Sequence, residues 1–242
     1  MKPTAIASVV LLAAGMASAQ QPPAFDPSSF VVIGEGLAAG MADFSLRDIY
    51  QDKSFPAQMA RQMNVPFPQP LIQPPGIGNV PGFQPLPVRL PGVLQGSVRE
   101  PFPPTADLLH NISIPGARLV DAMTREPGSP LIQPKDPQQT MVNMILGYPA
   151  LIAGTSIPLL TQTEYAILGV NPTFVLVELG YYDVLSAAVA DNPAALPDTG
   201  VFLGNYANLI RTLKSKGAKV LVTTIPDPFD TAYFSTMTEA AA

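Results

Sequence analysis

Residues 30–40 read FVVIGEGLAAG, and this stretch decides the expected fold. It opens with four apolar residues, three of them β-branched, which is typical of a buried strand. Gly34 ends the apolar run, and the small residues after it form a turn that opens toward a helix. In α/β proteins such a turn lies at the carboxyl edge of a parallel sheet, where ligands bind. We therefore expect a strand at 30–33 and a site in the loop that follows it.

The composition fits one globular domain. Of the 242 residues, 47% are hydrophobic and 13% are charged, so the chain can bury one sizeable core. The formal net charge is −5 and the 13 Lys and Arg residues form no basic cluster, which argues against a nucleic-acid partner. The chain has no Cys and a single His, which excludes disulfides and thiolate nucleophiles and argues against a metal site. We expect no cofactor.

The N-terminus has the pattern of an export signal. Lys2 precedes an apolar run, and the small residues 17–19 match a signal-peptidase site, which predicts a signal peptide at 1–19 and a mature chain that begins at Gln20. A membrane anchor is the alternative, but the apolar run is short for a bilayer span. Residues 20–29 form a Pro-rich, flexible lead-in. We expect a secreted or periplasmic protein with no transmembrane segment after cleavage.

Apolar and amphipathic segments alternate along residues 30–242 and predict one α/β domain. Apolar runs bounded by Pro or Gly predict further strands at 107–114, 174–179 and 219–225. Helices are expected between the Ser54 cap and Pro66, around 119–123, and at 140–146, 159–168, 184–190 and 201–216. Strands that alternate with helices imply an open parallel sheet covered by helices on both faces.

A Pro-rich insertion occupies residues 65–104. Proline fixes φ and removes an N–H donor, so this segment cannot form a central strand or a long helix. One interpretation is a lid or recognition surface over a site. The other, which we favour, is an extended strap that packs on the domain or stays partly disordered.

Three segments that follow expected strands resemble the motif blocks of the GDSL or SGNH hydrolases, a family that includes secreted lipases and esterases. Residues 34–37 (GEGL) resemble the block that names the family, 111–117 (NISIPGA) the second block, and 180–185 (GYYDVL) the GxND block. A TTIPDP segment at 223–228 overlaps the end of the last expected strand. The resemblance covers most of the chain after the signal, apart from the insertion. It implies a three-layer sandwich around a mostly parallel sheet, of the flavodoxin-like type.

The resemblance also implies that the catalytic groups are lost. The family's nucleophilic Ser falls on Gly36, the Asp before it on Glu35, and the oxyanion-binding Asn on Tyr182. The DxxH pattern that carries the general base is missing, and we interpret the single His110 as structural. The oxyanion-hole-like positions that remain are Gly36, Gly116 and Tyr182. Acyl transfer by this route needs an activated nucleophile and a base, so we expect a pseudoenzyme.

Three functions remain open. The first, which we favour, is an inactive homologue that binds a partner, or an ester, lipid or glycan ligand, in a cleft lined by Leu37, Asn111, Tyr181 and Asp183. The second is an active carboxylic-ester hydrolase that uses a different nucleophile or a water held by Glu35. The third is a structural envelope protein. The oligomeric state cannot be predicted from these residues.

The length of the chain bears on the expected sheet. The family's sheet has a fifth strand and a closing helix after the strand expected at 219–225. Here the chain reaches Ala242 soon after Pro226, so we expect that C-terminal strand and helix to be missing from it. An unprotected sheet edge would favour a fragment of a longer protein.

Overall fold

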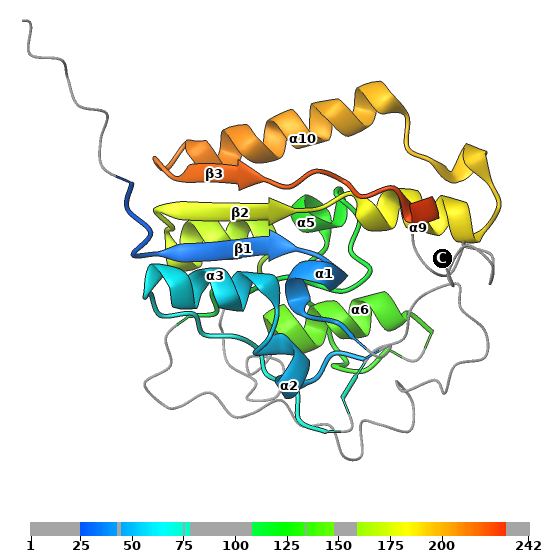
Figure 1. The fold of residues 1–242 in the computed structure, drawn as a ribbon. Coiled ribbons are helices and arrows are strands. Elements are labelled where there is room, and N and C mark those ends of the chain that lie inside the picture. The colour runs from blue at the N-terminus through cyan, green and yellow to red at the C-terminus, as the bar shows by residue number, and fades with distance from the viewer. Residues whose placement is uncertain are drawn as a thin grey trace, which may run out of the picture.

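The computed structural model describes residues 25–42, 45–74, 76–77, 108–133, 135–147 and 159–230. In this part of the chain, three strands form one all-parallel sheet in the order β1-β2-β3 (Figure 1). The strands are β1 Phe30–Gly34, β2 Phe174–Glu178 and β3 Lys219–Val222. Gly34 aligns with Glu178 in the register, so the carboxyl ends of neighbouring strands lie at one edge. The predicted α/β class, parallel sheet and three of the four strands are confirmed.

Helical segments connect the strands. Before β2 they are α1 Gly36–Ala39, α2 Asp48–Gln51, α3 Phe55–Met63, α5 Asp121–Thr124, α6 Pro137–Val142 and α8 Gln162–Glu164. The helices α6 and α8 continue as the π-helices η1 Asn143–Gly147 and η2 Tyr165–Val170. After β2 they are α9 Tyr181–Val189, the 3-10 helix η3 Pro193–Ala195, α10 Thr199–Lys214 and the 3-10 helix η4 Pro228–Asp230. Every helix predicted from the sequence is present, with its ends shifted by a few residues.

Side-chain caps begin both α3, where the cap was predicted, and α10, where no cap was predicted. The Ser54 hydroxyl accepts the Ala57 N–H, so α3 begins at Phe55. In the same way, the Asp198 carboxylate accepts the Val201 N–H at the start of α10. These local hydrogen bonds satisfy N–H groups that the first turn of a helix leaves free.

Alternate residues of β1 and β2 pack into two separate clusters, one on each face of the sheet. On one face the strands pack against α10 through Leu209 and Leu213. The strand residues of this cluster are Val31, Ile33, Val175 and Val177. On the other face Phe30 and Leu176 pack against α3 through Ala60. This alternation explains why both strands are buried along their whole length.

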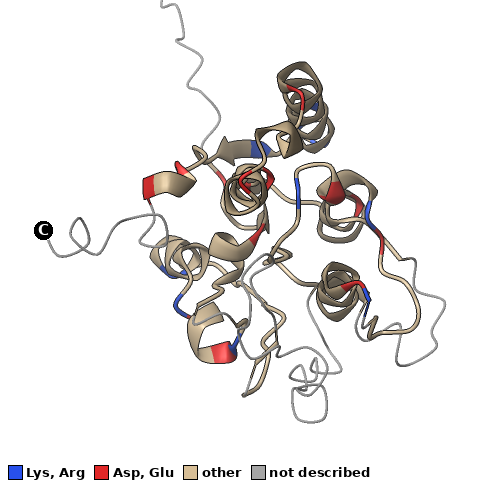
Figure 2. Cartoon of the chain, turned by 90° about the vertical axis from the view of Figure 1, so that its right-hand side faces the viewer, with Lys and Arg blue, Asp and Glu red and all other residues tan. Residues whose placement is uncertain are grey.

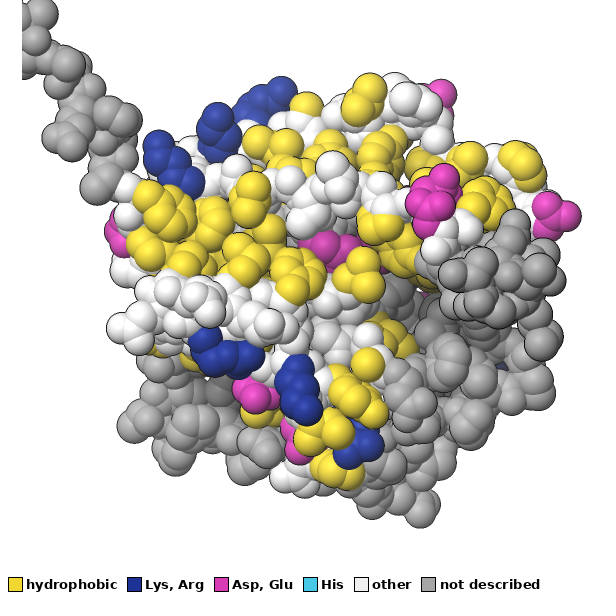
Figure 3. Space-filling model, in the orientation of Figure 1, with side chains coloured by type: hydrophobic (Ala, Val, Ile, Leu, Met, Phe, Trp, Pro, Cys, Tyr) yellow, Lys and Arg dark blue, Asp and Glu magenta, His cyan; other side chains and the backbone are white. Residues whose placement is uncertain are grey.

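The prediction that helices cover both faces of the sheet is wrong at β3. Val220 packs on the cluster with α10, but Leu221 is 46% exposed and Lys219 is exposed. Both point to the face that carries α3, which lies below β1 rather than over β3 (Figure 1). Figure 3, drawn in the same orientation, shows hydrophobic side chains gathered over the strands on this side.

The strand predicted at 107–114 is wrong as a regular strand, although residues 108–114 run beside β1. Val32 N–H donates to the carbonyl of His110, and Ile112 N–H donates back to Val32, which gives one parallel bridge between Val32 and Asn111. The pairing becomes irregular at Ile112, whose carbonyl accepts from Gln162 Nε2 at 2.8 Å. A side chain therefore takes an acceptor that a regular ladder would give to a backbone N–H.

Several predictions lie outside the described residues. They include the signal peptide at 1–19, the first half of the lead-in, at 20–24, and the insertion beyond residue 77. No helix among the described ranges has the length and apolar character needed to cross a membrane.

Candidate functional site

The three segments that carry the motif resemblance meet at the carboxyl edge of the sheet. Gly36 follows β1 as the first residue of α1, and Tyr182 follows β2 in the first turn of α9. Gly116 follows the segment beside β1, where Ile114 N–H donates to the carbonyl of Gly34 at 2.9 Å. Because β1 lies between this segment and β2, Gly36 lies between Gly116 and Tyr182. Figure 2 looks onto this edge and shows Lys and Arg residues scattered over the molecule rather than gathered.

Two buried glutamates hold this edge together by capping each other's helices. Glu178, at the end of β2, accepts through Oε2 the N–H groups of Glu35 and Ala38, each at 3.1 Å, at the start of α1. Glu35, at the end of β1, accepts through Oε2 the N–H of Tyr182 at 2.8 Å, at the start of α9. Each carboxyl group therefore satisfies the helix that follows the other strand. This reciprocal arrangement is called the Glu35–Glu178 pair below.

The Glu35–Glu178 pair is closed to solvent. Glu35 is 2% exposed and Glu178 is 4% exposed. Burial, with the neighbouring Glu178 as the second cause, raises the pKa of Glu35 to about 9. Burial also raises the pKa of Glu178 to about 7, and the N–H groups of Glu35 and Ala38 oppose this shift. At neutral pH Glu35 therefore carries a proton, while its Oε1 is buried without a hydrogen-bond partner.

A buried, protonated carboxyl group is a poor general base. A base must reach the proton that it removes, directly or through one water, and must be ionised at the working pH. Glu35 meets neither condition, because it is closed to water and its pKa is raised. Its hydrogen bond to Tyr182 assigns it the role of a helix cap.

The space around Gly36 would accommodate a side chain. It is half-exposed, and a Cβ built there would meet only the Met41 side chain, at 3.9 Å or more. A serine would therefore fit at the position where the resembled family has its nucleophile. The missing hydroxyl is not supplied by Ser113, because Ser113 is 2% exposed, with its Oγ 2.9 Å from the place of a Cβ at Gly34.

Asn111 and Asp183 connect the loops from within. Asn111 is buried and donates through Nδ2 to the carbonyl of Ala38 at 3.0 Å. Asp183 is also buried and accepts through Oδ2 the N–H of Leu119 at 2.8 Å. These two predicted cleft residues therefore position α1 and the loop after Gly116, and their side chains are not presented to solvent.

The surface of this edge is formed by the remaining predicted residues. Leu37 is 46% exposed, and Tyr181 and Tyr182 are half-buried. Burial raises the pKa of Tyr182, and the nearby Arg118 guanidinium opposes that shift. The phenol of Tyr182 therefore stays neutral and lies near a cation. An apolar side chain, two phenols and one guanidinium make a surface that can contact a ligand without reacting with it.

His110 lies away from this edge. It precedes Ser113, which lies beside Gly34, by three residues, or roughly 10 Å of extended chain. No cluster of three or more His, Cys, Asp or Glu suited to a metal occurs among the described residues. These observations agree with the structural interpretation of His110 without testing it.

Comparison with known proteins gives no relative: no family model, no curated protein and no solved structure matches the chain.

Three residues that support this edge, Glu178, Gln162 and Tyr206, were not assigned a role from the sequence. Gln162 Nε2 donates to the carbonyls of Gly34 and Ile112. Tyr206 O–H donates to the carbonyl of Leu179 at 2.9 Å. Glu178 and Tyr206 each stand as a polar group within an apolar pattern, a signal that predicts a buried hydrogen bond. Gln162 stands among the polar residues Thr161, Thr163 and Glu164, so its sequence gives no such signal.

Proposed function

We propose that this chain is a catalytically inactive homologue of the SGNH hydrolases that binds a ligand at the carboxyl edge of its sheet. The proposal includes the finer fold assignment, a flavodoxin-like three-layer sandwich of the SGNH type. Support for the assignment comes from the order of the motif segments: those that contain Gly116, Gly36 and Tyr182 follow, in turn across the sheet, the segment beside β1, then β1, then β2.

One observation supports the proposed loss of catalysis. At the position of the family nucleophile, Gly36 has no hydroxyl, and the nearest acidic group, Glu35, is buried as the cap of α9. Hydrolysis through an acyl-enzyme needs a nucleophile and a base in contact; among the described residues, Gly36 offers no nucleophile and Glu35 offers no accessible base. A water held by Glu35 is not supported either, since Glu35 is closed to solvent.

The proposed ligand is an ester, lipid or glycan. Leu37, Tyr181 and Tyr182 lie at the surface of the edge, and aromatic side chains can pack on an acyl chain or a sugar ring. The signal-like residues 1–19 support export, so the ligand would be met in a periplasm or outside the cell.

Ester hydrolysis tests the loss of activity. We would measure p-nitrophenyl acetate and butyrate hydrolysis by the unmodified chain, Gly36→Ser and Glu35→Gln. The unmodified chain should match the buffer rate, and Gly36→Ser should fold normally, because a side chain at 36 meets no close contact. Turnover by the unmodified chain that disappears in Glu35→Gln would contradict the proposal and would support the hydrolase alternative.

Backbone NMR tests the binding surface. Tributyrin and short oligosaccharides would be titrated into the ¹⁵N-labelled chain. One of these ligands should shift the amide signals of Leu37, Tyr181 and Tyr182, while the signals of exposed residues in α10, such as Lys214, stay in place. The absence of selective shifts at this edge with every ligand would contradict binding there.

A further inference from the structure

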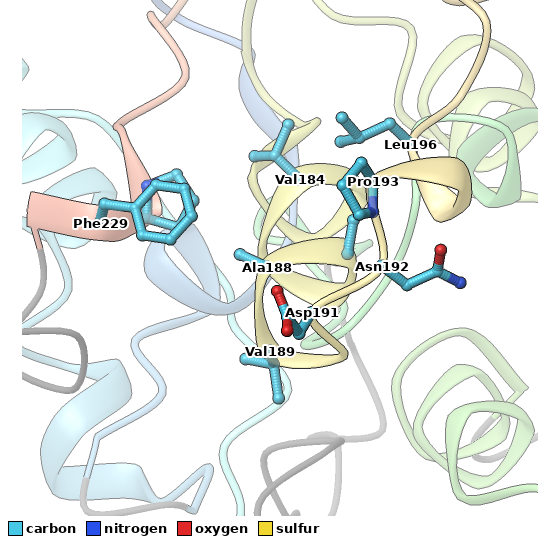
Figure 4. A pocket seen from close by; sticks show the side chains of 10 residues that line it. Val184, Ala188, Val189, Asp191, Asn192, Pro193, Leu196 and Phe229 are labelled. Carbon is cyan, nitrogen blue, oxygen red and sulfur yellow. The ribbon is translucent and has the colours of Figure 1, made fainter.

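A second feature of the molecule lies on the far part of α9, beyond the residues of the proposed site. A hollow of about 540 Å³ lies between α9, η3 and η4. Figure 4 shows Val184 and Ala188 of α9 on one side of the hollow and Phe229 of η4 on the other, with Leu196 beyond Pro193 at one end. Of the lining residues only Val184 falls within a motif loop, at 180–185, and it is not one of the residues of the proposed binding surface, so an inference about this hollow does not rest on the proposed function.

The lining of the hollow is mainly apolar. Its described polar members are Asp191 and Asn192. The side-chain oxygen of Asn192 already makes a hydrogen bond within the protein, because Oδ1 accepts the Ala194 N–H at 3.2 Å. Figure 4 shows the Asn192 amide pointing away from Phe229. A sugar or nucleotide needs several convergent donors and acceptors, whereas an alkyl chain needs only apolar contact. The hollow also has the volume typical of a small-molecule site.

One carboxylate, that of Asp191, lies at one end of the hollow, next to the C-terminal end of α9. The Asp191 carboxylate lies beside Ala188 in Figure 4, and no Lys or Arg is found among the described lining residues. Asp191 follows the C-terminal end of α9, and its N–H donates to the carbonyl of Ala188 at 3.1 Å. The carbonyl end of a helix carries partial negative charge and favours a cation. A ligand with a positive head group would therefore be favoured over one with a carboxylate.

We propose that this hollow binds the alkyl chain of a small cationic amphiphile, such as an alkylamine. The chain lies between α9 and η4, against Ala188, Leu196 and Phe229. The ammonium group lies at Asp191 and the C-terminal end of α9. Each methylene that enters the hollow should tighten binding about fourfold, until the hollow is filled.

Titration calorimetry of the full chain tests this with ligands of one chain length and different head groups. Octylamine should bind more tightly than 1-octanol, and 1-octanol more tightly than octanoate. From hexylamine to octylamine the affinity should rise about 15-fold. Equal or tighter binding of octanoate, an affinity independent of chain length, or no binding of any amine would overturn the proposal.

A variant without the Asp191 charge tests the head-group contact separately from the apolar contact. Asp191 has a φ of 47°, in the left-handed region that Asn also tolerates, so Asp191→Asn keeps the backbone and removes the charge. This variant should lose the preference for octylamine over octanol and keep the dependence on chain length. If Asp191→Asn keeps the full preference for the amine, the assigned head-group contact is wrong.

A filling variant tests the location. Ala188→Trp places an indole in the hollow and should abolish binding of all the alkyl ligands. The matched control is Ala207→Trp, at an exposed position of α10 away from the hollow, which should bind as the unmodified chain does. Unchanged binding by a folded Ala188→Trp would overturn the location. If this variant does not fold, Asp191→Asn decides the proposal.

Discussion

Replacing Glu35 with Gln tests the Glu35–Glu178 pair through the pH dependence of folding stability. The pKa of Glu35 is raised from 4.5 to about 9 in the folded chain. Between these two pH values the folded chain keeps a proton that the unfolded chain has lost, so stability falls as pH rises. The slope is about 1.4 kcal/mol per pH unit, and from pH 5 to pH 7 Glu35 alone lowers the free energy of unfolding by about 3 kcal/mol. Glu178, raised to about 7, acts in the same direction over the lower part of this window.

Gln at position 35 carries no titrating proton and keeps an oxygen that can accept the Tyr182 N–H. The free energy of unfolding of Glu35→Gln should therefore fall by about 3 kcal/mol less than that of the unmodified chain between pH 5 and pH 7. The assay is urea unfolding followed by circular dichroism at pH 5, 6, 7 and 8, because the chain has no Trp for fluorescence. Glu126→Gln, at an exposed position, is the matched control and should leave the pH profile unchanged. An unmodified chain whose stability rises from pH 5 to pH 8, or a Glu35→Gln profile equal to the unmodified one, would refute this argument.

Three further predictions concern the supports of the edge and the N-terminus. Gly180 has a φ of 104°, and a Cβ there would lie 2.8 Å from Ile225 and 2.9 Å from Phe202. Gly180→Ala should therefore lower the free energy of unfolding by about 1–3 kcal/mol, measured by urea unfolding. An unchanged urea midpoint would contradict the described turn. Gln162→Leu removes the donor to two backbone carbonyls and should cost about 1–3 kcal/mol in the same assay, whereas a neutral effect would show that these carbonyls find other donors. N-terminal sequencing of the exported chain should begin at Gln20, and an intact Met1 in that fraction would contradict the predicted cleavage.

The parts of the fold that were predicted from the sequence have local causes. A β-branched run in β1 and an apolar stripe in α10 are visible within one window of residues. Ser54 lies directly before the helix that it caps, so its role is also local. Such signals predict which elements exist and where helices begin.

The parts that could not be predicted depend on residues far apart in the sequence. The hydrogen bond from Glu35 N–H to Glu178 joins residues 143 positions apart, and nothing near Glu35 indicates it. The irregular pairing of residues 108–114 also depends on a distant residue: their pattern predicts a full strand, but Gln162 interrupts the pairing. For the candidate site, the sequence predicted the three loops but could not tell that Asn111 and Asp183 are buried within them.

The most direct test of the central claim, that this edge presents no activated nucleophile, is labelling with a fluorophosphonate followed by intact-protein mass spectrometry. The probe reacts with an activated serine hydroxyl, and Gly36 has none. The account predicts that the folded chain keeps its unmodified mass after incubation. A single stoichiometric adduct that maps to one serine, and that is lost when the chain is unfolded first, would contradict it.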